Sequence, residues 1–275
     1  MRLKLLLLLT FCSPAALYAQ STEADLKARL IHQPLYLREF WGENSLQYDS
    51  SGHLASGSDR VSFTLCGVDV TKIHLTNTGL ALDAKRVGLE LKGKTPKRVV
   101  LRVGEANDLK DEVMHLAISS PQNGDYKDTL DAIFATSLAD LTPSLPQYWQ
   151  TYAQQAFLSA NAPSPAPAST SPVNATKVDP AKRVGGTVKP PDLLQPMNPE
   201  FTEAAHNLKY PAKVVIQLIV EKDGTPSHLE VIKPAGLGLD EASLEAVHNY
   251  LFRPATENGV AIRVQLAVEV AFDIY

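Results

Sequence analysis

The sequence is poor in residues that build covalent frameworks. It has 2 cysteines, 3 methionines and 2 tryptophans, and aromatic residues make up 7% of it. Cys12 lies in an apolar N-terminal leader, so a chain without that leader keeps only Cys66. A single cysteine excludes an internal disulfide, and the fold must therefore be held by its core. Cys66 ends the run Val61–Leu65, and we interpret it as a small buried hydrophobic residue rather than a reactive thiol.

Motifs for catalysis and metal binding are also missing. There is no H-E-x-x-H, G-x-S-x-G or C-x-x-C pattern, and the seven histidines show no metal-ligand spacing. We therefore predict a protein that is not an enzyme, with no catalytic residues, metal or cofactor. The adjacent carboxylates Asp240 and Glu241 are better explained as the start of a helix, with Asp240 as the N-cap.

One nucleotide-binding pattern does occur, at Gly88–Thr95, which fits G-x-x-x-x-G-K-[ST]. A working phosphate-binding loop follows a buried strand and opens a helix. Here Pro96 follows, and Lys97–Val103 has the composition of a strand. The pattern therefore predicts a hairpin whose turn is Lys92-Gly93-Lys94.

The charge balance disfavours polyanionic partners. The formal net charge is -4, and acidic residues outnumber basic ones in residues 192–275. Nucleic acids and anionic lipids attract basic surfaces, so we predict no nucleic-acid partner.

The N-terminus has the layout of a secretory signal peptide. Arg2 and Lys4 precede the apolar run Leu5–Phe11, and Ala15–Ala19 offers a small-residue cleavage site before Gln20. We predict that residues 1–19 are removed and that the protein is periplasmic. The alternative is an uncleaved segment that anchors the chain in the inner membrane, although Leu5–Ala19 is short for a spanning helix and contains Pro14.

Residues 20–160 form a predicted β-rich domain with flanking helices at Glu23–Ile31 and Tyr126–Leu138. Its short alternating runs favour a sandwich, an open barrel or a curved sheet, and no ligand is assigned to it. The expected strands are Leu35–Phe40, Leu46–Asp49, Val61–Leu65, Thr71–Thr76, Gly79–Leu82, Arg86–Leu91, Arg98–Val103 and Val113–Ile118. Residues 161–191 are rich in Pro, Ala and Ser and predict a linker, which either spans the periplasm or keeps two domains apart.

Residues 192–275 read as a small α+β unit, with β-runs at Val214–Val220 and His228–Ile232, a helix at Asp240–Leu251 and a last alternating strand. From about Gly185 onward, this order of parts resembles the C-terminal domain of the TonB family of energy transducers. The matches include Asn198-Pro199-Glu200-Phe201, Leu239-Asp240-x-Ala242 and Phe252-Arg253-Pro254-Ala255. The residues matching family structural motifs are Phe201, Asp223, Gly224, Asp240, Tyr250, Phe252, Arg253, Pro254 and Gly259. The chain departs from the usual pattern at Phe201-Thr202, His206 and Tyr250, where the family has Tyr-Pro, Arg and Trp.

The resemblance implies a partner-binding strand. In the family, outer-membrane receptors pair a short N-terminal box with the terminal strand, and this supports TonB-dependent transport. The matching residues here are Arg263, Val264, Gln265, Leu266, Ala267, Val268, Glu269, Val270, Ala271 and Phe272. Two alternatives remain: an envelope scaffold or adaptor, which includes a homodimer formed through this strand, and a carrier whose ligand binds residues 21–160.

The resemblance does not extend to the part of the family that couples to the proton gradient. Family members that draw on the proton gradient couple to the ExbB–ExbD channel through a membrane helix with an intramembrane Ser and His. Residues 1–20 contain no His. The sequence therefore predicts the receptor-binding end of a transducer without the group that couples to ExbB–ExbD.

Overall fold

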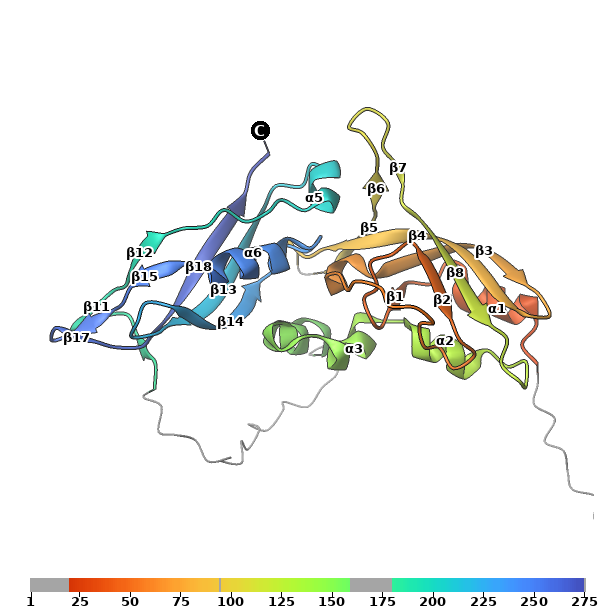
Figure 1. The fold of residues 1–275 in the computed structure, drawn as a ribbon, viewed down its shortest axis with the longest axis horizontal. Helices are drawn as coiled ribbons and strands as arrows, with labels where there is room; N and C mark the ends of the chain where they lie inside the picture. The colour runs from red at the N-terminus through yellow and green to blue at the C-terminus, as the bar shows by residue number, and fades with distance from the viewer. Residues whose placement is uncertain (1–19, 94, 159–179, 275) are drawn as a thin grey trace, which may run out of the picture.

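The computed structural model describes residues 20–93, 95–158 and 180–274, so the predicted signal peptide lies outside the described residues. The described residues form two β-rich domains that lie side by side (Figure 1), and the predicted α+β class is confirmed. The predicted linker is described only from residue 180 onward.

The N-terminal domain is built on one curled sheet, which is the curved-sheet alternative among the expected arrangements. Its strand order is β2-β8-β4-β3-β1-β9, with β5 paired to β4. The strands are β1 (Leu35–Leu37), β2 (Ser45–Tyr48), β3 (Gly67–Leu75), β4 (Gly79–Glu90), β5 (Lys97–Val100), β8 (Val113–Ser119) and β9 (Phe134–Ala135). A short hairpin of β6 (Arg102–Val103) and β7 (Lys110–Asp111) projects from it (Figure 1).

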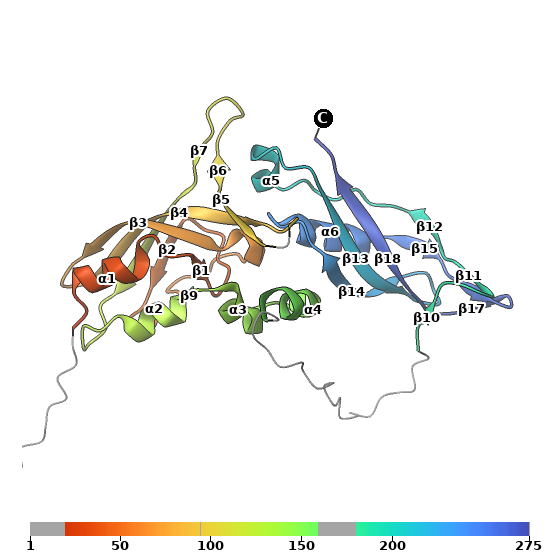
Figure 2. The ribbon, with the colours of Figure 1, turned by 180° about the vertical axis from the view of Figure 1, so that it is seen from behind.

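One face of this sheet carries the core. Along β8, Met114, Leu116 and Ile118 are buried while the residues between them are exposed, as expected for a strand with one covered face. Figure 2 shows α1 beside β3, and α2 to α4 along the lower side of the sheet. The helices are α1 (Glu23–Leu30), α2 (Lys127–Ile133), α3 (Leu138–Leu141) and α4 (Gln150–Ala153), with single turns η1 (Phe63–Leu65), η2 (Thr142–Ser144), η3 (Gln147–Trp149) and η4 (Gln154–Leu158).

Several expected elements differ from the structure. Val61–Leu65 is not a strand, because Ser62 Oγ accepts from Thr64 N at 3.0 Å and caps the turn η1. The strands expected at Gly79–Leu82 and Arg86–Leu91 are one strand, β4, and the strand expected at Arg98–Val103 is divided between β5 and β6. The second helix ends at Ile133, because Phe134–Ala135 pairs with β1 instead. At Val61–Leu65 a local side-chain hydrogen bond replaces the expected strand, and at Phe134 a tertiary strand pairing ends the expected helix.

Two interpretations from the sequence are confirmed. Glu90 pairs with Lys97 in the antiparallel β4–β5 ladder, so the nucleotide-binding pattern at Gly88–Thr95 lies in a hairpin. Cys66 is fully buried, and burial raises the pKa of its thiol to about 12. A thiol with so high a pKa is not a nucleophile at neutral pH.

The C-terminal domain consists of a four-stranded sheet of order β10-β18-β13-β14, two small sheets and two helices. The small sheets are β11-β16-β17 and β12-β15. The elements are β10 (Lys182–Arg183), β11 (Val188–Lys189), β12 (Asp192–Gln195), α5 (Glu203–Asn207), β13 (Ala212–Val220), β14 (Pro226–Lys233), α6 (Leu239–His248), β15 (Leu251–Arg253), β16 (Thr256–Glu257), β17 (Val260–Ala261) and β18 (Val264–Phe272). The predicted linker therefore ends in two short strands that pair within this domain.

The two domains are joined by backbone pairing. The end of β4 forms an antiparallel bridge from Glu90 to Gly236. Leu91 N donates to Ala235 O at 2.8 Å, and Leu237 N donates to Leu89 O at 3.0 Å. The loop Ala235–Gly238 thus pairs with the end of β4 through a single β-bridge, and the apolar cores of the two domains are continuous. The part of the linker that the structure describes does not hold the domains apart.

Side chains from several parts of both domains reinforce this junction. Gly238 N donates to Thr64 Oγ1 at 2.9 Å, and Asn207 Nδ2 donates to Arg102 O at 2.9 Å. The Lys92 ammonium lies 3.7 Å from the ring centroid of Tyr210, within cation–π range. The contacts come from separate parts of both domains, so they fix the orientation of one domain on the other.

We predict that Gly236→Ala uncouples the domains. Gly236 has φ +90°, and a Cβ there would lie 2.0 Å from the Leu89 carbonyl oxygen, so the bridge to β4 cannot persist. We expect a loss of about 3 kcal/mol or more in the free energy of unfolding, measured by urea denaturation. Gly259→Ala is the matched control, because Gly259 has φ +80° but nothing lies within 4 Å of the added carbon. It should lose only about 1 kcal/mol, from backbone strain. Equal losses in the two variants would contradict a role for Gly236 in the junction.

Candidate functional site: the outer edge of the last strand

The predicted partner-binding strand is β18. Its first two residues lie between β10 and β13, and the rest of the strand forms an edge of the sheet. It pairs with β13 in unbroken antiparallel register, from Val264 opposite Val220 to Phe272 opposite Ala212. On its other side β10 pairs only with Val264 and Gln265, in parallel. Among the described residues, no strand pairs with the outer side of Leu266–Phe272. This stretch therefore presents a row of backbone groups to solvent.

The direction of each backbone group follows from one hydrogen bond. Lys182 N donates to Arg263 O at 2.9 Å, so the carbonyl of Arg263 points to the outer side. Alternate residues of a strand point their N–H and C=O groups to the same side, and the register with β13 contains no bulge. Gln265, Ala267, Glu269 and Ala271 therefore also direct their backbone groups outward. The last three of these have no pairing strand.

The docking of the two domains leaves this edge accessible. Strand β14, at the opposite end of the sheet from β10, lies against η3 and α4 of the N-terminal domain. The outer side of β18 is consequently the side of the sheet turned away from the junction, as Figures 1 and 2 show. A partner can reach the edge without separating the domains.

The two faces of β18 alternate in burial, as the sequence predicts. Val264, Val270 and Phe272 are buried, whereas Ala267, Glu269 and Ala271 are exposed on the opposite face. Helix α6 packs mainly on β13 and β14 rather than on β18. The Phe272 end is covered instead by Phe201, whose ring centroid lies 5.6 Å away at 80°. Leu266 and Val268 remain half-buried, because α6 does not extend over them.

The charged groups of β18 are already paired. Arg263 donates to both carboxylate oxygens of Glu221, with distances of 2.6 and 2.8 Å, and this hydrogen bonding lowers the pKa of Glu221. Glu269 accepts from Lys213 Nζ at 2.6 Å, which lowers the pKa of Glu269. Because each of these charges is balanced by a neighbour, the edge offers backbone hydrogen-bonding groups rather than a net positive or negative charge.

Three of the matched family residues, Asp223, Gly224 and Phe252, meet at one turn. Asp223 Oδ1 accepts from Thr225 N at 2.9 Å, and Gly224 follows with φ +88°. Phe252 N donates to Gly224 O at 3.0 Å, so the turn holds the strand β15. A Cβ at Gly224 would lie 1.9 Å from Phe252 O, which explains why glycine is required there.

Four other matched residues follow one another in the segment from Tyr250 to Gly259. Tyr250 packs its ring against Phe252, with centroids 6.2 Å apart, and Arg253 pairs with Asp192 at 2.9 Å. Pro254 follows the end of β15. Gly259, with φ +80°, is in the turn between β16 and β17. Tyr250, Phe252, Arg253, Pro254 and Gly259 thus lie in or beside β15 and in the β16–β17 turn, outside β18.

Asp240 does not cap α6 as predicted. The N-cap is Gly238, and Asp240 is buried inside the first turn. Its carboxylate accepts from Ala235 N at 2.8 Å and from Gly236 N at 2.7 Å. The side chain thus reaches back to the junction loop, because that loop has backbone donors that no other group satisfies.

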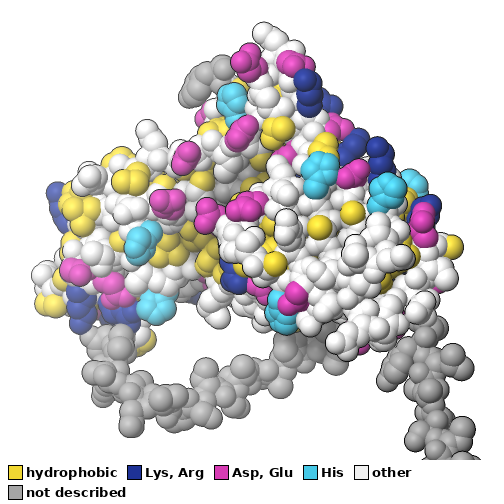
Figure 3. Space-filling model, turned by 45° about the vertical axis from the view of Figure 1, so that its right-hand side comes forward, with side chains coloured by type: hydrophobic (Ala, Val, Ile, Leu, Met, Phe, Trp, Pro, Cys, Tyr) yellow, Lys and Arg dark blue, Asp and Glu magenta, His cyan; other side chains and the backbone are white. Residues whose placement is uncertain are grey.

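Glu241 lies beside it at the domain junction. Its Oε1 accepts from Trp149 Nε1 at 2.9 Å, whereas its Oε2 is buried and has no hydrogen-bond partner. Burial raises the pKa of both Asp240 and Glu241. Hydrogen bonds from the backbone of Ala235 and Gly236 oppose this effect at Asp240, and the hydrogen bond from Trp149 opposes it at Glu241. Tyr148, Leu229 and Leu244 lie with Glu241 around a pocket at the domain junction. Figure 3 shows hydrophobic side chains in the hollow between the two domains.

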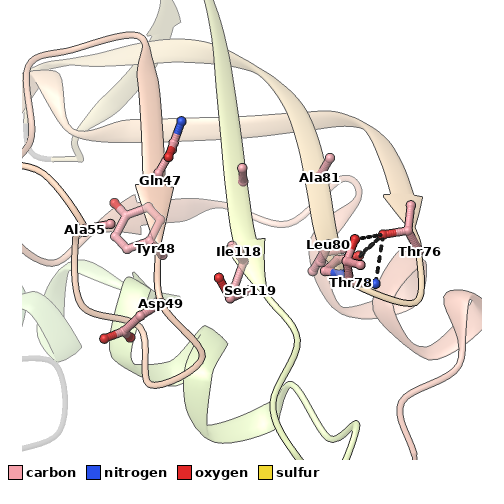
Figure 4. Close-up of a pocket in the computed structure, with 12 residues that line it drawn as sticks. Gln47, Tyr48, Asp49, Ala55, Thr76, Thr78, Leu80, Ala81, Ile118 and Ser119 are labelled. Atoms are coloured by element: carbon pink, nitrogen blue, oxygen red, sulfur yellow. Dashed lines mark hydrogen bonds between the residues drawn. The ribbon is translucent and has the colours of Figure 1, made fainter.

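The N-terminal domain has a cavity of about 330 Å³. Figure 4 shows Tyr48 and Gln47 on one side and Thr76, Thr78 and Leu80 on the other. The two threonine hydroxyls lie within 3.2 Å of each other, so part of their hydrogen-bonding capacity is satisfied internally. The cavity contains hydroxyl, amide and apolar groups and one carboxylate, Asp49. This lining does not define a ligand class for the carrier alternative.

The described residues carry neither a candidate metal site nor a candidate membrane span. No group of three or more His, Cys, Asp or Glu side chains among them is arranged to hold a metal ion. None of their helices has the length and apolar character needed to cross a membrane.

Sequence reasoning missed the pairing of β10 and the role of the loop Ala235–Gly238. Residues Lys182–Arg183 sit in a segment of linker composition, so no local pattern marks them as a strand. The loop did carry a signal, because Gly236 and Gly238 flank Leu237 in a segment that requires positive φ.

We predict that Glu241→Gln flattens the dependence of stability on pH. A carboxyl whose pKa is raised by folding binds more protons in the folded state. Wild-type stability should therefore fall as pH rises from about 4.5 through the raised pKa. Glutamine keeps an acceptor for Trp149 and removes the buried charge, so the fall should shrink by about 1 kcal/mol or more. Urea denaturation between pH 4.5 and 8 measures this. Glu245→Gln, an exposed change on the same helix, is the control. An unchanged pH dependence of stability in Glu241→Gln would contradict a raised pKa at Glu241.

Comparison with known proteins supports the resemblance predicted for the C-terminal domain. No curated protein matches the chain. Residues 197–274 match the family model described as Gram-negative bacterial TonB protein C-terminal. That family is a non-enzymatic interaction and energy-transducer domain of envelope-associated proteins, and it generally interacts with outer-membrane receptors. The resemblance predicted from the sequence is therefore confirmed for residues 197–274, which are similar to the C-terminal domain of TonB proteins.

Proposed function

We propose that the C-terminal domain binds a short extended peptide of an outer-membrane receptor by strand addition to the outer edge of β18. The protein would act in the periplasm, where the predicted signal peptide would direct it, and would contribute to TonB-dependent transport. The observation that carries this proposal is the accessible row of outward backbone groups at Ala267, Glu269 and Ala271 in a domain similar to the C-terminal domain of TonB proteins.

The chemistry of the edge sets the expected affinity. Three outward residues offer up to six backbone hydrogen bonds, each worth about 0.5–1.5 kcal/mol net. The half-buried Leu266 and Val268 add apolar contact on one face. After the cost of ordering a flexible peptide, we expect a dissociation constant of about 10–100 µM. Such binding depends on backbone pairing and tolerates variation in the peptide sequence.

We predict that a synthetic peptide carrying the N-terminal box of a TonB-dependent receptor perturbs alternate amides of β18. In an NMR titration, the amides of Ala267, Glu269 and Ala271 should shift and gain protection from hydrogen exchange. The intervening amides already face β13 and should change less. Perturbation centred on another surface would contradict strand addition at this edge.

A pair of variants at one position sharpens this test. Ala267→Pro removes an outward N–H without affecting the ladder to β13, a change that edge strands tolerate. It should weaken peptide binding about fivefold or more, in line with the loss of at least one backbone hydrogen bond. Ala267→Ser keeps the N–H and should bind like wild type.

A homodimer through the same edge is the alternative outcome. In that case the amides of Ala267, Glu269 and Ala271 would change with protein concentration in the absence of peptide. Analytical ultracentrifugation would show the corresponding dimer.

A further inference from the structure

The chain places one of its own segments on the edge of β18. Lys182 and Arg183 pair in parallel with Val264 and Gln265. The hydrogen bond from Lys182 N to Arg263 O uses one of the outward groups that a partner would use. Five alternate residues from Arg263 to Ala271 direct their backbone groups outward. β10 covers the first two, and no strand among the described residues lies beside the other three.

A side-chain ion pair holds Lys182 beside the β16–β17 hairpin. Lys182 Nζ lies 2.5 Å from Glu257 Oε2 in the neighbouring hairpin, and Thr187 Oγ1 donates to Glu257 Oε1 at 3.2 Å. The Lys182 side chain is 52% exposed, so the ion pair is worth little by itself. The segment is thus positioned on the edge but not buried in the core.

The segment is also tethered close to its site. The turn at Gly185–Gly186 has positive φ at both residues, and Val188 N donates to Gly185 O at 3.1 Å. Strand β11 then pairs with β16, with Val188 opposite Glu257. A short tether of this kind gives an effective concentration in the millimolar range. A pairing of only two residues can therefore persist, whereas a free peptide making the same pairing would bind only at millimolar concentration.

We propose that Lys182–Arg183 is a built-in competitor for the partner-binding edge of β18. The inference rests on the proposed function, because it assigns a regulation to the same edge. While β10 is paired, a partner reaches only Leu266–Phe272. When β10 is displaced, the outward groups of Arg263 and Gln265 become available, and the partner strand lengthens at that end. Binding of the partner and pairing of β10 then oppose each other.

Two proline variants of the full chain test this. Lys182→Pro removes the donor to Arg263 O and the cation that pairs with Glu257. Arg183→Pro removes one basic charge as well, but alternate residues of a parallel strand face opposite sides, so its N–H points away from β18. β10 lies at the surface, and both variants should keep the wild-type melting temperature within a few degrees.

The expected result has two parts. In Lys182→Pro, the amide of Gln265 should exchange at least about tenfold faster than in wild type. The box peptide should bind that variant about threefold to tenfold tighter than it binds wild type, because the competing state has been removed. Arg183→Pro should match wild type in both measurements. Equal peptide affinity for wild type and Lys182→Pro would overturn the competitor while leaving the proposed function intact, and tighter binding to both variants would assign the effect to charge.

A second probe separates the two proposals. A synthetic peptide with the sequence Pro180–Gly186 of this chain, added at millimolar concentration to match the tether, should shift the amide of Gln265 in Lys182→Pro and leave it unmoved in wild type. If the box peptide binds no variant, the proposed function fails, and this self-peptide still decides whether the internal segment occupies the edge. Shifts in neither protein, or equal shifts in both, would overturn the proposal.

Discussion

The buried carboxylate of Asp240 is the interaction on which the arrangement of the two domains depends. It accepts from the backbone of Ala235 and Gly236 and so holds a loop in which Gly236, Leu237 and Gly238 all have positive φ. Such a loop is strained and needs fixed hydrogen bonds to persist. Held in this form, it presents Ala235 O and Leu237 N to the end of β4. One side chain thereby determines the loop, and the loop determines the docking.

The docking in turn determines which edge of the C-terminal sheet is open. Strand β14 faces η3 and α4 of the N-terminal domain, so β18 is left on the far side. A partner strand added there would be anchored to a unit whose core continues into the N-terminal domain. The two domains are therefore positioned to act as one body on any partner that binds β18. The N-terminal domain then serves as a platform whose orientation relative to the edge is fixed by backbone pairing.

The sequence predicted well those features that local pattern determines. The alternation in β18 identified a strand with one apolar face, and the Asp223-Gly224 turn and the hairpin at Lys92-Gly93 follow from turn chemistry. Features set by distant contacts escaped it. Asp240 has the residue type and position of an N-cap, and only the neighbouring loop, with its free donors, shows that the carboxylate turns the other way. The pairing of Phe134–Ala135 with β1 likewise ends a helix that the local sequence would continue, and Lys182–Arg183 has no strand signal without β18 beside it.

The short pairing of β10 reconciles two opposing demands on an exposed edge. An open strand edge with half-buried Leu266 and Val268 invites unwanted pairing between chains, which favours a covering segment. A partner-binding edge, however, must release its cover at little cost. A cover of two residues, held by one exposed ion pair and a short tether, protects one end of the strand while leaving the outward groups of Ala267, Glu269 and Ala271 accessible. A longer cover would protect the edge better and would bind too firmly to yield to a partner whose own affinity comes from the same backbone groups.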